Sequence, residues 1–308
     1  MRYKELKVAI LYGGNSSERT ISLKSGKNIA NSLKDLGIQS DLIDTKYQFS
    51  IDRIASVRYD KIFIALHGKN GEDGTIQRIL DKFKMNYTGN GFYSSFIGTH
   101  KILTKKIWFS LKLPTAPFFY INKKSFFMQP RSAISSVFKK IGFPLIIKPD
   151  SEGSSIGVRK AFSLKEAERI LVESFKYDQY IIIEKYIIGP EYTVSILNPY
   201  YILPSIKIDL YGDEIFSYGN KYDKFVEYIC PGGSSQSKEI LIKKIALAAY
   251  KAIGCFGLSR VDLKQNYDGN FYLLEINTVP GMTDRSLVKI AAEQSGMSFS
   301  KLVGKILY

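Results

Sequence analysis

Residues 257–277 read GLSRVDLKQNYDGNFYLLEIN. Two apolar runs, 257–264 and 270–277, lie on either side of Asp268-Gly269, a dipeptide that favours a two-residue turn between antiparallel strands. We therefore predict a β-hairpin, and the position of its turn determines which residues of the two strands face each other.

With that turn, Asp262 faces Glu275 and Arg260 faces Asn277, and all four side chains share one face because side chains alternate along a strand. Two opposed carboxylates repel each other unless a cation joins them. Mg²⁺ prefers hard oxygen ligands and keeps substrate phosphates in its shell. The hairpin thus predicts a metal site beside a guanidinium that stabilises developing charge. The alternative is a solvated hairpin with an Arg–Asp pair, which the apolar flanks disfavour.

Strands alternate with helices in the first third of the chain, which predicts parallel pairing and a three-layer α/β unit over 1–97. The expected strands are 7–12, 40–43 and 61–66, and the expected helices are 17–36 and 74–83.

Two further units, 98–187 and 188–308, mix strands and helices. In the first we expect helices at 94–111 and 164–175 and strands at 144–148 and 179–185. In the second we expect strands at 191–197 and 202–210, a helix at 238–253, the hairpin, and helices from Ser286. The polar stretch 211–237 is long for a loop, and such loops are often functional lids.

The composition is that of a globular protein, with 308 residues, 45% hydrophobic and 24% charged. No apolar run approaches the ~20 residues that cross a bilayer, and the start lacks a signal-peptide cleavage site. We therefore expect no membrane partner. The only cysteines are Cys230 and Cys255, which favours a reducing cytoplasm.

The formal net charge is +15. A positive net charge of this size raises the possibility of a nucleic-acid partner. The basic residues are spread along the chain, however, in short pairs such as Lys105-Lys106, and they form no tail or arm. We therefore expect no nucleic-acid partner.

Several other residues have both a chemical and a plain structural interpretation. The turn at 150–157, DSEGSSIG, follows Lys148 and could hold a phosphate or be a flexible loop. Glu18 could bind a ligand ammonium or complement a helix dipole. Glu184-Lys185 could meet an adenine edge and a phosphate or end a surface strand. Gly281 could donate its N–H, and Ser286 could hold a carboxylate or cap a helix.

In this order, these pieces resemble the D-alanine–D-alanine ligase family of the ATP-grasp superfamily almost from end to end. The motifs that carry the resemblance are GGNSSER at 13–19, ALHG at 65–68, GEDG at 71–74, YTG at 87–89, KP at 148–149, EGSS at 152–155, EK at 184–185, GPE at 189–191, KY at 221–222, RVD at 260–262 and EINTVPGMT at 275–283.

The resemblance implies an N-terminal substrate domain (1–97) followed by a two-part ATP-grasp fold (98–187 and 188–308) with a lid at 211–237. It implies ligation of two D-alanines to D-alanyl-D-alanine for peptidoglycan synthesis. ATP would convert the first carboxylate into an acyl phosphate, the second amine would attack it, and ADP and phosphate would leave. A cytoplasmic homodimer is also implied.

The resemblance assigns roles by matching position. ATP would contact Lys101, Lys148 and Lys221 through its phosphates, and Glu184, Lys185, Ile187 and Glu191 through adenine and ribose. Asp262, Glu275 and Asn277 would bind two Mg²⁺, for which Mn²⁺ can substitute. The substrates would meet Glu18 and His67, the Glu18–Ser154–Tyr222 triad, the oxyanion site of Arg260 and Gly281, and the carboxylate site of Ser286 and Leu287.

Two positions depart from the family pattern. His100 precedes Lys101 where relatives usually carry Asp, and Arg285 stands where relatives often have a smaller or neutral residue. Three alternatives stay open: a related ATP-grasp ligase for another acid or amine, an inactive ligase, and a nucleic-acid-binding protein. Phosphate release from ATP with D-alanine compared with D-lactate separates D-alanine ligation from a related ligase. A nucleic-acid-binding protein would release no phosphate with D-alanine and ATP, and neither would an inactive ligase.

Overall fold

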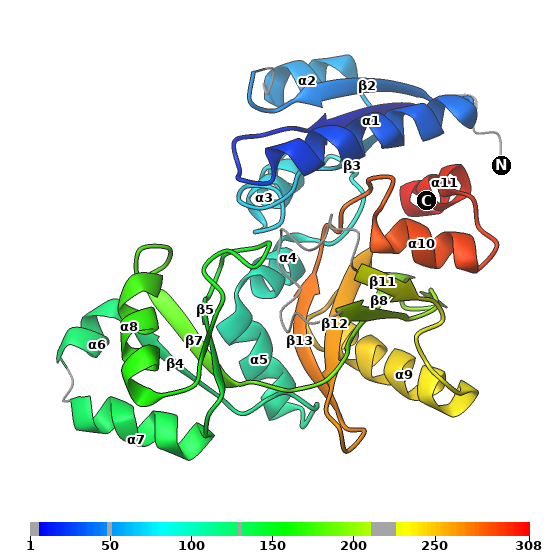
Figure 1. The fold of residues 1–308 in the computed structure, drawn as a ribbon. Helices are drawn as coiled ribbons and strands as arrows, with labels where there is room; N and C mark the ends of the chain where they lie inside the picture. Colours follow the sequence, from blue (N-terminus) through cyan, green and yellow to red (C-terminus); the bar gives the residue numbers. More distant parts are fainter. Residues whose placement is uncertain (1–5, 48–50, 129–130, 211–225) are drawn as a thin grey trace.

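The computed structural model describes residues 6–47, 51–128, 131–210 and 226–308. Three β-sheets follow one another along the chain, with helices against them (Figure 1). The first sheet is parallel and the other two are antiparallel. The predicted fold class, α/β followed by α+β, is confirmed.

The N-terminal elements are β1 (Lys7–Tyr12), α1 (Arg19–Asp35), β2 (Gln39–Asp44), α2 (Ile51–Val57), β3 (Lys61–Ile64) and α3 (Thr75–Lys82). The strand order is β2-β1-β3. Because side chains alternate along β1, Val8 and Ile10 join a core with α1, while Ala9 and Leu11 join another with α2 and α3. Two cores on opposite faces of one sheet make the three layers that the sequence predicts.

The helix predicted over 94–111 is two helices, α4 (Phe92–Thr99) and α5 (Lys101–Ser110), because the backbone leaves helical geometry at His100. Asp150 stabilises the first turn of α5. Its carbonyl accepts a hydrogen bond from the Lys101 N–H at 3.2 Å, and its Oδ1 accepts one from the Ile102 N–H at 2.7 Å. These bonds satisfy amides at the start of α5.

The central elements are β4 (Phe118–Asn122), α6 (Lys123–Met128), α7 (Arg131–Ile141), β5 (Leu145–Pro149), β6 (Arg159–Ala161), α8 (Leu164–Ser174) and β7 (Tyr180–Lys185). The sheet order β4-β7-β5-β6 buries Ile147 and Ile183 against Phe138 of α7 and Leu171 of α8. The sequence pattern predicts β5, α8 and β7. It misses the short β4, β6, α6 and α7.

The C-terminal elements are β8 (Glu191–Asn198), β9 (Tyr201–Ile202), β10 (Ile206–Leu210), β11 (Val226–Ile229), α9 (Gln236–Ala252), β12 (Ser259–Gln265), β13 (Phe271–Asn277), α10 (Leu287–Gln294) and α11 (Phe299–Leu307). The sheet order is β11-β10-β8-β12-β13, with β9 beside β8. One face packs on α9 through Val194, Val261 and Leu273. Helix α5 adds Trp108, whose Nε1–H donates to the Ala249 carbonyl at 3.1 Å.

The hairpin of β12 and β13 has the predicted register at its functional end, where Asp262 pairs with Glu275 and Arg260 with Asn277. The predicted two-residue turn is wrong. The loop has three residues, 267–269, because the Asn266 N–H bonds the Asn270 carbonyl across it, and Gly269 takes a left-handed φ of 87°. A left-handed residue at the end of a three-residue loop is a common hairpin solution.

A β-bulge restores the register that the longer loop would have shifted. The pairing steps from Asp262↔Glu275 to Leu263↔Leu273, which leaves Leu274 as the extra residue of β13. The two departures offset each other, so the predicted partners still face one another. The bulge also places Leu274 and Glu275 on the same side of the sheet, because both line one pocket.

Two other expectations need correction. The strand predicted over 202–210 is interrupted at 203–205, where Pro204 can donate no ladder hydrogen bond. Part of the predicted lid, 211–237, is regular structure, because Val226–Ile229 pairs with β10 and α9 begins at Gln236. Lys221 and Tyr222 lie in 211–225, outside the described residues.

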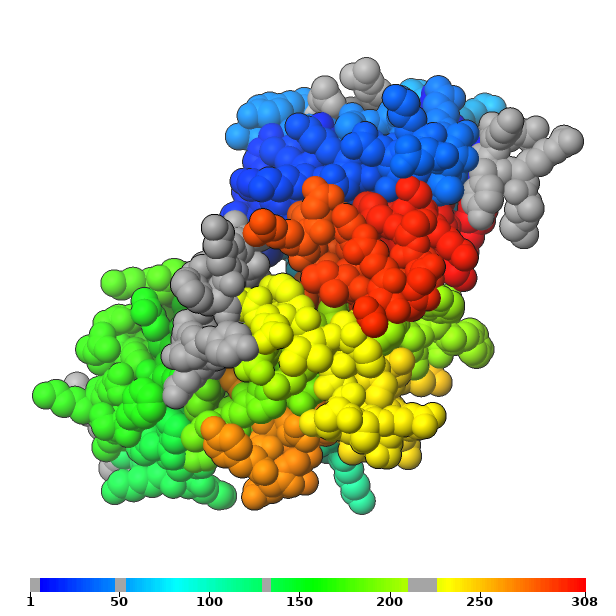
Figure 2. Space-filling model, turned by 45° about the vertical axis from the view of Figure 1, so that its right-hand side comes forward, coloured from blue at the N-terminus to red at the C-terminus, as the bar shows by residue number. Residues whose placement is uncertain are grey.

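The two ends of the described chain pack together. Leu302 and Val303 of α11 share a core with Ile29 and Leu33 of α1, and the C-terminal residues lie directly against the N-terminal ones on the surface shown in Figure 2. Within the described ranges, none of the helices has the length and apolar character needed to cross a membrane.

His100 and Asp150 form an ion pair at the break between α4 and α5. His100 Nδ1 lies 2.7 Å from Asp150 Oδ2, and this hydrogen bond raises the pKa of His100 against the effect of partial burial. Asp178 also raises the pKa, whereas Lys101 lowers it. The pair therefore stabilises the fold when His100 is protonated.

We predict that His100→Asn destabilises the protein more at pH 5.5 than at pH 9. A histidine whose folded pKa is raised contributes stability below its unfolded pKa and loses it as pH rises through the folded pKa. The difference in unfolding free energy between wild type and variant should be about 1 kcal/mol larger at the lower pH. Urea unfolding at both pH values measures it, and equal differences would contradict the prediction.

Candidate active site

Two cavities meet at the centre of the molecule. A narrow pocket lies between the central sheet and the C-terminal sheet, and a wider cleft of about 910 Å³ lies between the N-terminal loops, the loop 151–154 and the end of β13. Both cavities are lined by Lys101, Glu152, Arg260 and Glu275. A ligand in the pocket can therefore reach a ligand in the cleft.

The pocket is lined by side chains from five strands, β5, β7, β8, β12 and β13. Its apolar surface includes Ile146 of β5 and Leu274 of β13, which come from different sheets. Sequence-predicted residues make up much of the remaining lining, namely Lys101, Lys148, Glu184, Lys185, Ile187, Glu191, Arg260, Asp262 and Glu275. The residues predicted from the sequence therefore lie together in this pocket.

Lys148 and Glu184 form a buried ion pair. Lys148 Nζ lies 2.8 Å from Glu184 Oε1, and both side chains are buried. Burial alone would raise the pKa of Glu184, but the attraction of Lys105 and Lys148 lowers it. Burial would likewise lower the pKa of Lys148, but Glu184 and Glu275 raise it. Both groups are therefore charged near neutral pH.

Lys185 and Lys101 donate to backbone carbonyls. Lys185 Nζ bonds the Phe143 carbonyl at 2.7 Å, and Lys101 Nζ bonds the Glu152 carbonyl at 2.6 Å. Lys101 Nζ also lies 3.9 Å from Glu275 Oε2. Since Lys101 lines both cavities, its charge lies at their junction.

Arg260 and Asp262 are bound to each other along β12. Arg260 Nε and Nη2 donate to the two oxygens of Asp262 at 2.9 and 2.8 Å, and Thr193 Oγ1 donates to Asp262 Oδ1 at 2.6 Å. Burial would lower the pKa of Arg260, but the Asp262 carboxylate raises it. The Arg–Asp pair of the alternative interpretation is thus present, but it is buried in a pocket rather than solvated.

The oxygens around this pair fit a divalent cation. Asp262 faces Glu275 across the ladder, and Asn277 follows on the same strand. Together they offer two carboxylates and an amide oxygen, the hard donors that Mg²⁺ prefers. The described residues contain no cluster of three His, Cys, Asp or Glu side chains that could hold a metal, so the amide and a ligand's own oxygens would have to complete the shell.

Glu18 reaches across the cleft instead of capping its own helix. It stands at the N-cap of α1 without a side-chain cap bond, and its carboxylate accepts a hydrogen bond from Ser154 Oγ. Glycines on two sides leave room for it: a methyl group on Gly68 or Gly153 would lie 2.9 or 3.2 Å from Glu18 Oε2. Ser154 itself has a left-handed φ of 50°. The helix-dipole interpretation of Glu18 therefore does not account for its position.

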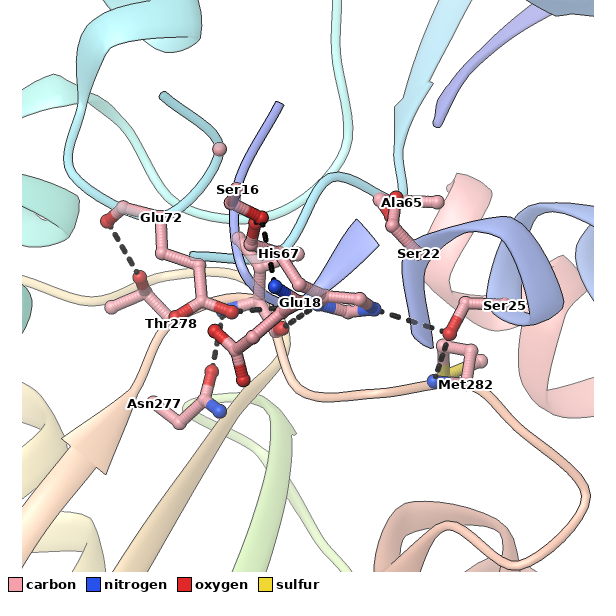
Figure 3. A network of polar contacts seen from close by, with 12 residues as sticks. Ser16, Glu18, Ser22, Ser25, Ala65, His67, Glu72, Asn277, Thr278 and Met282 are labelled. Atoms are coloured by element: carbon pink, nitrogen blue, oxygen red, sulfur yellow. Dashed lines mark hydrogen bonds and ion pairs between the residues drawn. The ribbon is translucent and has the colours of Figure 1, made fainter. Parts of the chain in front are cut away.

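His67 contacts α1 and the loop that follows β13 (Figure 3). Its Nδ1 lies 2.9 Å from the Val279 carbonyl, and its Nε2 lies 3.1 Å from Ser25 Oγ, which in turn accepts from the Met282 N–H at 3.0 Å. These contacts flank Gly281 on both sides. In this structure His67 positions the loop rather than lining the cleft.

Besides His67, three predicted residues of the described chain line neither cavity: Gly281, Ser286 and Leu287. Ser286 is the N-cap of α10, and its Oγ accepts a hydrogen bond from the Lys289 N–H at 3.4 Å. The interpretation of Ser286 as a helix cap is confirmed, and its binding of a substrate carboxylate stays a prediction.

Two residues of this region were not predicted as site residues from the sequence. Glu72 lines the cleft, and its carboxylate lies 3.4 Å from His67 Nδ1. Burial raises the pKa of Glu72, although His67 opposes the shift. Lys105, treated above as half of a basic pair, is fully buried and lies 2.8 Å from Glu184 Oε2. Its spacing of four residues from Lys101 along one helix was the available signal.

Comparison with known proteins agrees with this geometry. The family model described as "D-ala D-ala ligase N-terminus" matches residues 39–90, and "D-ala D-ala ligase C-terminus" matches residues 107–308.

Two crystal structures of D-alanine–D-alanine ligase from Bacillus anthracis are similar over nearly the whole chain. One, complexed with ATP, is 31% identical with a TM-score of 0.82, and the other is 33% identical with a TM-score of 0.83. Each comparison covers 98% of this chain and 96% of the other. The two family models and the similarity to these solved ligases over nearly the whole chain show that this chain belongs to the D-alanine–D-alanine ligase family.

Proposed function

We propose that this protein joins two D-alanine molecules through an acyl phosphate, with ATP in the narrow pocket and the amino acids in the cleft. The observation that carries the proposal is the shared lining of the two cavities at Lys101, Arg260 and Glu275. A phosphoryl group can pass from one ligand to the other only where their sites are continuous, and the groups at this junction carry the charges that phosphoryl transfer requires.

In this proposal Glu184, Lys185, Ile187 and Glu191 surround adenine and ribose, while Lys101 and Lys148 contact the phosphates. The lining of the pocket supports both assignments. Lys221 is assigned to the phosphates by resemblance alone. Asp262, Glu275 and Asn277 are the residues that would hold two Mg²⁺, or Mn²⁺ in its place. The bound cations would offset the negative charge of the triphosphate.

The first D-alanine binds with its ammonium at Glu18 and its carboxylate toward the nucleotide. Its carboxylate oxygen bonds to the γ-phosphorus of ATP as the bond to ADP breaks. The amine of the second D-alanine, whose carboxylate is held at Ser286 and Leu287, then attacks the carbonyl carbon. Arg260 and the Gly281 N–H stabilise the tetrahedral oxyanion. Collapse of this intermediate breaks the bond between the carbonyl carbon and the phosphate oxygen, and the departing phosphate takes the proton that the attacking nitrogen loses.

The Glu18–Ser154 contact supports closure over the substrates, with Tyr222 of the lid as the third member of the triad. Exclusion of water matters because water would hydrolyse an acyl phosphate. His67 acts in this proposal by holding the loop that carries Gly281, as its contacts with Val279 and Ser25 suggest.

The proposed domains are 1–97, 98–187 and 188–308, with the lid within 211–237. Each of the three sheets falls within one of these ranges. We also propose a homodimer, supported by the exposed aromatic side chains of Tyr93 and Phe256, which line one surface depression. Both cysteines are free thiols, which supports a cytoplasmic location.

We predict that Glu275→Gln lowers Mg²⁺-dependent phosphate release by at least about 100-fold, because loss of one carboxylate weakens both the cation site and the charge at the junction. Phosphate release with ATP and D-alanine, titrated with Mg²⁺, measures the effect. Glu293→Gln, an exposed carboxylate of α10, is the control. Equal rates for wild type and Glu275→Gln would refute the metal assignment. No release by wild type with D-alanine would refute the substrate.

We predict that Ser154→Ala raises the KM for D-alanine about tenfold and leaves the KM for ATP within about twofold. The hydroxyl bonds the Glu18 carboxylate, and a hydrogen bond to a charged group contributes about 1.5–3 kcal/mol. Initial rates at varied D-alanine and varied ATP separate the two constants. Ser300→Ala, whose hydroxyl bonds the Asp35 carboxylate outside both cavities, should match wild type. A rise in the KM for ATP without a rise in the KM for D-alanine would contradict the proposed role of Ser154.

A further inference from the structure

Lys105 is a buried charge that the proposed reaction does not use. It lies on α5 one turn after Lys101, and its side chain has no exposure to solvent. A lysine buried this completely is unfavourable unless its ammonium finds partners, because desolvation of an ion costs several kcal/mol. Burial accordingly lowers its pKa, and the Glu184 carboxylate opposes this shift.

Three acceptors surround the ammonium, one for each of its protons. Glu184 Oε2 of β7 lies at 2.8 Å, Thr115 Oγ1 at 2.8 Å, and the Leu273 carbonyl of β13 at 3.3 Å. An ammonium has three donors and no acceptor, so this set satisfies it. The acceptors belong to the central sheet, to the segment after α5 and to the C-terminal sheet.

On the side of the central sheet, Lys105 determines what Glu184 and Lys148 can do. Glu184 lies between two ammonium groups, Lys105 at Oε2 and Lys148 at Oε1, each at 2.8 Å. With Lys105 present, one carboxylate faces two ammonium groups, so the group as a whole has a net positive charge. Lys148, which lines the pocket, can therefore attract a phosphate. Without Lys105, Lys148 and Glu184 would neutralise each other.

Glu184 keeps capacity to accept a further hydrogen bond. Its Oε1 is buried and forms an ion pair with Lys148, but it accepts no hydrogen bond from any described residue. Glu184 lines the pocket whereas Lys105 does not. A carboxylate held in this way accepts from an N–H but repels a carbonyl oxygen.

On the side of the C-terminal sheet, Lys105 holds the start of the bulge. Leu273, whose carbonyl it bonds, directly precedes Leu274 and Glu275, the two bulge residues that face the pocket. One buried ammonium thus ties together the two sheets that form opposite walls of the pocket.

We propose that Lys105 is a positioning residue for the nucleotide: it fixes Glu184 to recognise the amino group of a 6-aminopurine and leaves Lys148 charged for the phosphates. The inference rests on the proposed function, because it assumes that the purine lies at Glu184.

The first test is Lys105→Met, which keeps an apolar stem and removes the charge. ATP affinity should fall about tenfold or more, and the preference for ATP over ITP, which has a carbonyl at the 6 position, should fall at least about threefold. The KM for D-alanine should change less than about twofold. Isothermal titration with ATP and ITP measures binding without turnover. Lys106→Met is the matched control, because its ammonium bonds Tyr120 Oη outside the pocket.

Two further variants keep the test decisive even if Lys105→Met does not fold. Thr115→Val removes one acceptor of Lys105 and no pocket residue, and it should weaken ATP binding in the same direction by about threefold. In a Glu184→Gln background, Lys105→Met should cost less ATP affinity than it does in wild type, because the part of its effect that acts through Glu184 is already lost.

Unchanged ATP affinity and unchanged ATP/ITP preference in Lys105→Met or Thr115→Val, with only a lower melting temperature, would overturn the inference and leave the proposed function intact. Additive losses in the double variant would also overturn it. Conversely, wild type that binds ATP but releases no phosphate with D-alanine would refute the proposed function. The ATP and ITP affinities of wild type and Lys105→Met would still test the role of Lys105.

Discussion

The antiparallel pairing of β12 with β13 is the constraint on which the rest of the site depends. Val261, Leu263, Leu273 and Ile276 bury one face of this pair in the core under α9, and the opposite face must therefore carry Arg260, Asp262, Glu275 and Asn277. A slip of one residue would exchange the two faces. The hydrophobic core thus sets the positions of the charges, and the bulge at Leu274 reconciles that register with a three-residue loop.

Burial of charge is the second feature of the site. Lys105, Lys148, Glu184 and Asp262 are each at most 8% exposed, and unpaired ions at these positions would destabilise the fold. Each has a partner of opposite charge within 3 Å. Such pairs hold dipoles and charges in place before a ligand arrives, which is the arrangement that stabilises developing charge most effectively. The third feature, the contact of Glu18 with Ser154, joins the N-terminal part to the loop after β5 and so closes the cleft from the other side.

Local patterns predicted the elements that local physics decides. Apolar runs predicted β1 and β7, the turn at 13–15 and the end at Gly37 bounded α1, one-sided apolar spacing predicted α9, and the Asp-Gly dipeptide located the hairpin. The predicted loop length was wrong and the partners of Asp262 were right, because the bulge offset the error. The helix break at His100 was not predicted, because His100 is neither Gly nor Pro and the break depends on Asp150, which is distant in sequence. The short strands β4 and β6 were not predicted either.

The sequence by itself determined the family, the fold class and most of the residues around the two cavities, because these depend on residue types at fixed spacings along the chain. Only the tertiary structure decided which charge neutralises which. Lys105 resembles an ordinary basic residue until α5, β7 and β13 close around it. Electrostatic energy depends on distance in space and on burial, and neither quantity is a property of the linear chain.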